Sequence, residues 1–60
     1  MDDTIREGYE LIATGLLVAR NIADYMPRSR EMSLTITKID EAILWLKNDQ
    51  ARAESEVENG

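Results

Sequence analysis

The stretch from Tyr25 to Glu31, Tyr-Met-Pro-Arg-Ser-Arg-Glu, decides the fold, because it holds the one proline of a 60-residue chain. Proline disfavours the α conformation in the residue before it, so a first helix should end by Met26. Ser29 is a favourable N-cap, and Glu31 would then lie in the first turn of a second helix. The sequence therefore predicts a break over residues 26–29 between two helices.

Apolar residues on both sides of this break recur at the spacings of amphipathic helices. The predicted upstream seam is Ile5, Tyr9, Ile12, Leu16, Ala19, Ala23 and Met26, and the downstream seam is Met32, Ile36, Ile39, Ile43 and Leu46. Alternating steps of four and three residues are typical of helices packed lengthwise on one another. We predict an all-α antiparallel two-helix hairpin with a helix over 4–25, a hinge over 26–29, a helix over 30–53 and a frayed acidic tail over 54–60.

The small size of the chain favours self-association. A chain of this length buries only about 60% of the surface that its unfolded form exposes, and such domains usually need disulfides, a metal or oligomerisation. The sequence has neither cysteine nor histidine, which removes disulfides and the usual metal ligands. Each helix also carries more apolar side chains than one seam uses, Tyr25 and Trp45 above all. We expect the hairpin to form a helical homo-oligomer; a single hairpin with a wide apolar core is the alternative.

Composition also bounds the function. Without thiol nucleophiles or imidazole bases we expect no enzyme, and we expect no cofactor. The net charge of −5 repels long nucleic acids. No apolar run approaches the roughly 20 residues of a membrane span, and the acidic start is unlike a secretion signal. We therefore expect a soluble intracellular binding or interaction protein.

The charge is uneven along the chain. Residues 1–26 carry a net charge of −3, residues 27–38 carry +2, and residues 39–60 carry −4. Only the hinge and the start of the second helix are basic. A helix N-terminus presents unpaired N–H groups and the positive end of the helix dipole, which favours a compact anion such as a nucleotide.

Six side chains around the hinge form the candidate ligand-binding site. Guanidinium groups suit phosphate oxygens and stack on nucleobases, and hydroxyls donate hydrogen bonds to phosphate. The candidates are Tyr25, Arg28, Ser29, Arg30, Ser33 and Thr37. In the alternative, Ser29 only caps the helix while Arg28 and Arg30 pair with Asp24, Glu31 or tail carboxylates. We expect no catalytic and no metal-binding residues.

The hinge segment resembles a known family. Residues 27–42, followed by Trp45, are similar to the pattern Pro-x-Ser-Arg-Glu-x-Ser-Leu-x-x-Thr-x-Leu-Glu-x-Ala, followed by Trp, of phage anti-CBASS sponges and of the helical Thoeris anti-defence sponges that share their hairpin. The resemblance covers about residues 5–52. It implies a protomer that assembles, typically as a hexamer, and sequesters cyclic di- or trinucleotide signals or related cyclic nucleotides without cleaving them. The expected location is the cytoplasm of the infected bacterial host.

The resemblance makes Arg30 the leading ligand contact, with Ser29, Ser33 and Thr37 at matching positions. Longer members carry, before the hairpin, a segment that helps to line a cyclic-dinucleotide pocket, and we expect this chain to lack it. After Trp45 the family tends toward a small residue and asparagine, where Leu46 and Lys47 stand here, so that end of the interface should pack differently. The alternative function is a structural coiled-coil hairpin or adaptor that docks on a partner protein.

Overall fold

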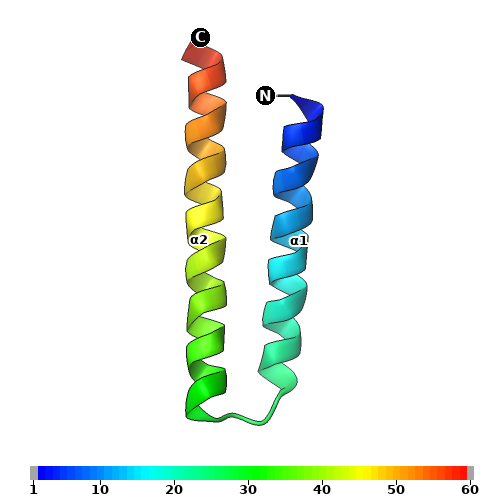
Figure 1. Cartoon of the computed structure of the whole chain (residues 1–60), viewed down its shortest axis with the longest axis vertical. Helices are drawn as coiled ribbons and strands as arrows, with labels where there is room; N and C mark the ends of the chain where they lie inside the picture. Colours follow the sequence, from blue (N-terminus) through cyan, green and yellow to red (C-terminus); the bar gives the residue numbers. More distant parts are fainter. Residues whose placement is uncertain (1, 60) are drawn as a thin grey trace.

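Two helices form the whole fold. The computed structural model describes residues 2–59, and side chains through residue 56. Helix α1 spans Asp3–Tyr25 and helix α2 spans Arg30–Asn59, and Figure 1 shows them running side by side in opposite directions, joined by a short hinge. The hairpin measures 47 × 16 × 10 Å. The predicted all-α architecture of two helices packed against each other is confirmed.

Local interactions fix the start of α1 and both sides of the hinge within one residue of the predicted bounds. The Asp2 carboxylate accepts a 2.8 Å hydrogen bond from the backbone N–H of Thr4 and caps α1. Met26 leaves the helix with φ −77° and ψ 152°, the extended conformation expected before a proline. The Ser29 hydroxyl oxygen accepts a 3.0 Å hydrogen bond from the backbone N–H of Met32 and caps α2.

The second helix is longer than predicted. It continues to Asn59, so the predicted helix end at residue 53 is wrong, and the described part of the tail predicted over 54–60 is helical. Arg52 lies 2.7 Å from Asp49 and 2.8 Å from Glu56, one turn away on either side. Such i,i+3 and i,i+4 pairs support a helix that has little apolar surface.

The packing face of α2 follows its predicted seam. Ile36 is 6% exposed, as is Ala23 on α1, and these two are the buried hydrophobic residues among the described residues. The other seam members of α2 are half-buried: Met32, Ile39, Ile43 and Leu46. A seam read from spacing alone therefore located the inner face of α2 correctly.

The inner face of α1 is turned from the predicted one. Tyr9, Leu16 and Ala23 face α2 as predicted. Four other members of the predicted seam stay exposed at its edge: Ile5, Ile12, Ala19 and Met26. Ala13 and Arg20 are half-buried in their place. The apolar arc of α1 is wide, so periodicity does not fix its centre, and polar contacts from α2 select the orientation.

Much apolar surface remains uncovered in the hairpin. Tyr25 is 90% exposed, Leu11 73% and Trp45 68%. Other large apolar side chains that are half exposed or more are Ile5, Ile12, Leu17, Val18, Ile22, Leu34 and Leu44. In the described part of the chain, no helix combines the length and the hydropathy of a membrane-crossing segment.

Candidate functional site

The hinge gathers the candidate residues at one end of the hairpin. Residues 26–29 connect the helices, and every side chain from Asp24 to Glu31 is exposed. Tyr25 ends α1 and Arg30 begins α2, so the two lie on opposite sides of the hinge. The fold therefore brings the aromatic ring, both arginines and the start of α2 to the same end of the molecule (Figure 1).

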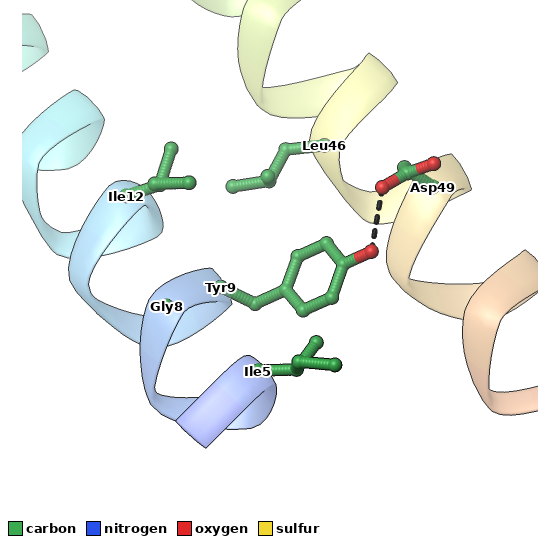
Figure 2. Close-up of a pocket in the computed structure, with 6 residues that line it drawn as sticks. All are labelled: Ile5, Gly8, Tyr9, Ile12, Leu46 and Asp49. Atoms are coloured by element: carbon green, nitrogen blue, oxygen red, sulfur yellow. Dashed lines mark hydrogen bonds between the residues drawn. The ribbon is translucent and has the colours of Figure 1, made fainter. Parts of the chain in front are cut away.

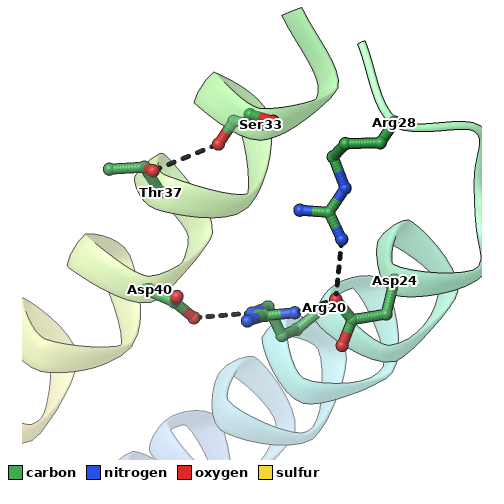
Figure 3. A network of polar contacts seen from close by, with 6 residues as sticks. All are labelled: Arg20, Asp24, Arg28, Ser33, Thr37 and Asp40. Carbon is green, nitrogen blue, oxygen red and sulfur yellow. Dashed lines mark hydrogen bonds and ion pairs between the residues drawn. The ribbon is translucent and has the colours of Figure 1, made fainter. Parts of the chain in front are cut away.

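Arg28 is engaged within the chain. Its guanidinium Nη2 lies 3.5 Å from Asp24 Oδ1, as Figure 3 shows. Both side chains are about half exposed, 54% and 49%, so the pair is solvent-screened and weak. The pairing of Arg28 with Asp24, one of the two alternatives raised by the sequence, is therefore present, and an incoming anion would compete with this carboxylate.

Arg20 organises the polar contacts beside the hinge. Its Nε donates a 2.8 Å hydrogen bond to Asp40 of α2, and its Nη1 lies 2.6 Å from Asp24 Oδ1 (Figure 3). Nη1 is shielded from solvent, and its contact with Asp24 is an ion pair. The pKa of Arg20 is raised, first by Asp24 and then by Asp40.

The partner of Arg20 on α2 was missed in the sequence. In the sequence, Arg20 is a single polar residue at the edge of an apolar seam. Asp40 comes into contact with it only through the antiparallel register of the two helices. The signal that predicts such a pair is charge complementarity between residues that the register of the hairpin brings side by side. Asp24 pairs with both Arg20 and Arg28, and Arg20 also pairs with Asp40. This edge of the hairpin therefore has little free positive charge.

Arg30 differs from Arg20 and Arg28 in having no carboxylate partner among the described residues. Its side chain is exposed and has no hydrogen bond or ion pair with any side chain described by the structure. Arg30, Ser33 and Thr37 are spaced three and four residues apart, which places them on one face of α2, and all three are exposed. The one cation near the hinge that is free among the described residues therefore shares a helix face with two hydroxyls.

The hydroxyls on this face are not equivalent. Thr37 Oγ1 donates a 3.1 Å hydrogen bond to the backbone carbonyl of Ser33, shown in Figure 3, and Thr35 Oγ1 donates likewise to Glu31 at 2.9 Å. Their protons are used by the helix backbone in the unliganded chain, so each hydroxyl would have to leave its carbonyl before it could donate to a phosphate. Ser33 Oγ has no hydrogen bond within the described residues and keeps its donor. Ser29 accepts from the backbone and also keeps its donor.

A second polar cluster lies at the open end of the hairpin. The Tyr9 hydroxyl donates a 2.5 Å hydrogen bond to Asp49 Oδ2, and Arg52 Nη2 donates to Asp49 Oδ1 at 2.7 Å. The hydrogen bond to Asp49 raises the pKa of Tyr9, while the bonds from Tyr9 and Arg52 lower the pKa of Asp49. Tyr9 belongs to the predicted apolar seam, and its bond between the helices was not predicted from the sequence.

A groove borders this cluster. Figure 2 shows Tyr9 crossing from α1 to Asp49, between Ile5 and Ile12 and below Leu46. The groove has a volume of about 290 Å³, and Gly8 also lines it. Its walls are mostly aliphatic, and the one carboxylate in it is already bonded by two donors. The groove therefore has no free polar group that would fix a ligand.

The described residues contain no cluster of three or more His, Cys, Asp or Glu side chains arranged to hold a metal ion. What the hinge offers is one unpaired guanidinium, one guanidinium shared with a carboxylate, and two hydroxyl donors near a helix N-terminus. Such groups bind anions and orient them. No protein-family model, curated protein or solved structure matches the chain.

Proposed function

We propose that the chain is a non-enzymatic sponge that binds cyclic oligonucleotide second messengers at the junctions of a homo-oligomer. The observation that carries the proposal is Arg30, an unpaired exposed guanidinium that shares a face with Ser33 in the one basic segment of an acidic chain. In this proposal the cyclic phosphates contact Arg30 and the N-terminus of α2. Arg28 adds charge after exchanging Asp24 for phosphate, and Ser29, Ser33 and Thr37 orient the ring, with Tyr25 at its border.

The resemblance of the hinge segment to phage anti-CBASS and Thoeris anti-defence sponges supports the same proposal. By that resemblance the assembly is a hexamer that acts in the cytoplasm of an infected bacterium and holds the signal away from its effector. Charge-assisted hydrogen bonds contribute about 1.5 to 3 kcal/mol each, so a few of them from several chains suffice for tight capture after desolvation. Sequestration of an intact ligand requires no nucleophile, general base or metal.

Calorimetric titration with a panel of cyclic di- and trinucleotides tests the proposal. We expect Arg30→Ala to abolish the heat of binding while the oligomer mass in native mass spectrometry stays unchanged. Lys47→Ala is the matched control, since it removes one exposed positive charge from the other half of α2. Equal affinities of the two variants would contradict the site, and a ligand recovered cleaved after denaturation would contradict the sponge.

A second candidate function is a hairpin adaptor that docks on a partner protein. The ion pair between Arg28 and Asp24 and the uncovered apolar side chains of both helices favour it. It predicts no heat with any cyclic nucleotide and a monomer or dimer that captures one defined protein. The same titration therefore separates the two functions.

A further inference from the structure

A hollow lies on the surface of α1 away from the groove described above. It has a volume of about 290 Å³ and is lined by Glu7, Glu10, Leu11 and Thr14, which we call the α1 hollow. These residues follow the spacing i, i+3, i+4, i+7, and all four are exposed. Four residues at this spacing form the hole that receives one side chain of a facing helix in a coiled coil.

The side chain that suits such a hole is present on the same face of α1. Leu11, Val18 and Tyr25 are seven residues apart, so they form one row along the helix. Their exposed fractions are 73%, 51% and 90%, and α2 covers none of them. Leu11 belongs both to this row and to the α1 hollow, so the hollow and Tyr25 lie at opposite ends of one exposed apolar row.

This arrangement is self-complementary when two α1 helices run antiparallel. Val18 lies midway between Leu11 and Tyr25, so a two-fold axis beside Val18 brings Tyr25 of each copy to the hollow of the other. We propose that a second copy of this chain docks antiparallel on the exposed row of α1, with each Tyr25 seated in the α1 hollow of the other copy. Isologous contacts of this kind are the commonest in homo-oligomers.

Charge selects the antiparallel direction and the second copy as occupant. The first half of α1 is acidic, with Glu7 and Glu10 beside the hollow, whereas the hinge is basic, with Arg30 unpaired among the described residues and Arg28 shared with Asp24. Antiparallel docking places the acidic half of each copy beside the basic hinge of the other. Parallel docking would set like charges against each other.

The hydroxyl of Tyr25 also finds a partner in this arrangement. It reaches the carboxylate rim of the hollow formed by Glu7 and Glu10, as the Tyr9 hydroxyl reaches Asp49 within the chain. Aromatic side chains with a polar tip are enriched at such contacts because they bury a large area at low entropic cost.

The exposed row of α1 is thus the proposed contact surface for the self-association that the proposed function assumes. This contact does not depend on nucleotide binding. In this arrangement Tyr25 belongs to the contact between copies and lies next to the proposed ligand site. The same arrangement also brings the hinge of one copy next to the first turns of α1 in the other.

A single cysteine at the axis tests the contact. The chain has no cysteine, so Val18→Cys introduces the only thiol. Mild oxidation should convert most of this variant to a disulfide-linked dimer, since the two thiols lie at the axis. Leu44→Cys is the control, because Leu44 is 58% exposed on α2, and it should remain largely uncrosslinked. Crosslinking of Val18→Cys no faster than that of Leu44→Cys would overturn the proposal.

Reversible association gives an independent measurement. In sedimentation equilibrium, Tyr25→Ala should raise the dissociation constant at least about tenfold relative to Leu44→Ala, because an anchor side chain is lost. Glu7→Arg should weaken association, and Glu7→Arg combined with Arg28→Glu should restore it. Circular dichroism of each variant monitors the fold of the hairpin. An unchanged dissociation constant for Tyr25→Ala would remove it from the contact.

Failure of this inference is distinguishable from failure of the proposed function. If the unaltered chain is oligomeric and binds cyclic nucleotides but Val18→Cys does not crosslink, the surface is wrong and the proposed function stands. If Val18→Cys crosslinks while no cyclic nucleotide binds, the surface stands and the proposed function is wrong.

Discussion

Asp49 joins the two helices at the open end by accepting from both Tyr9 and Arg52. Each of its oxygens serves one donor, and the bond from Tyr9 forms only when α1 and α2 are in register. The lowered pKa of Asp49 and the raised pKa of Tyr9 have the same origin, since their hydrogen bond favours the carboxylate and the protonated hydroxyl together. Stability should therefore depend on pH at both extremes.

Tyr9→Phe should lower the thermal midpoint by removing this hydrogen bond. The contribution of Asp49 is complete above its ordinary pKa of 3.8 and is lost as the pH falls through its lowered value in the hairpin. The contribution of Tyr9 is complete below its ordinary pKa of 10.0 and is lost as the pH rises through its raised value.

Melting curves followed by circular dichroism check this prediction. The difference in midpoint between the unaltered chain and Tyr9→Phe should be constant from about pH 5 to about pH 9 and should shrink outside that range. A difference that stays the same from about pH 2 to about pH 12 would show that the contribution of the Tyr9 hydroxyl does not depend on the charge of Asp49.

The candidate site illustrates which single residues a sequence can reveal. Ser29 as the cap of α2 follows from local chemistry, and the pairing of Arg28 with Asp24 follows from i,i+4 spacing. The engagement of Thr37 with the Ser33 carbonyl is also local, but hydroxyl rotation decides it, and residue type alone does not. The bond between Tyr9 and Asp49 depends on the register of the hairpin, which a single sequence does not display.

At the scale of the elements, α2 depends on its first turn. The hydrogen bond from Met32 N–H to Ser29 Oγ satisfies one of the unpaired donors there. The extended backbone of Met26 ahead of Pro27 sets the chain apart from α1 before α2 begins. The hinge is therefore short and defined by local interactions, which is why its bounds could be predicted from the sequence.

Ser29→Ala should destabilise the hairpin by about 1 kcal/mol, the usual contribution of an N-cap side chain. Ser29→Asp should retain stability, because aspartate caps equally well. Urea denaturation at one protein concentration measures the three free energies of unfolding. Equal values for the alanine and aspartate variants would show that the cap does not contribute.

Gly15 presents a different question within α1. An added Cβ would meet no atom of this chain within 4 Å, and the residue has ordinary helical backbone. No other part of the hairpin approaches Gly15 so closely that a glycine is required at this position.

Gly15→Ala should accordingly raise the free energy of unfolding by about 1 kcal/mol through helix propensity. The measurement is urea denaturation, with Gly8→Ala as the matched control, since its Cβ also meets open space. A loss of stability in Gly15→Ala alone would show that the backbone of another copy lies against Gly15.

The two helices were not equally predictable. The spacing of apolar residues predicted the inner face of α2 correctly, although Leu34, Leu44 and Trp45 lie outside it, whereas the inner face of α1 was predicted only in part. The contact of Arg20 with Asp40 selects one orientation within the wide apolar arc of α1. The extension of α2 beyond residue 53 was missed because its support is ionic, through Arg52, and has no apolar period.

At the scale of the whole molecule, burial is slight. Ala23 and Ile36 are the only buried hydrophobic residues among the described residues, while Leu11, Tyr25 and Trp45 are largely exposed. Two packed helices of this size gain little from hydrophobic burial to offset the loss of conformational entropy. Association of copies would supply the missing burial and would also remove apolar surface from water.

The thermal midpoint should therefore rise with protein concentration. For a dimer, each tenfold increase in concentration adds about 1.4 kcal/mol to the apparent stability. Trp45 is the only tryptophan and is 68% exposed in the hairpin, so its emission reports separately whether association covers it. A midpoint independent of concentration from micromolar to millimolar would identify a folded monomer.

The start of α1 and the end of α2 lie together at the end of the rod opposite the hinge (Figure 1). A peptide tag or a surface anchor joined at either terminus would thus stand at the far pole from Arg28 and Arg30. Immobilised chains would present their arginines to the flowing solution, so sensor-based affinity assays suit this molecule in either attachment orientation.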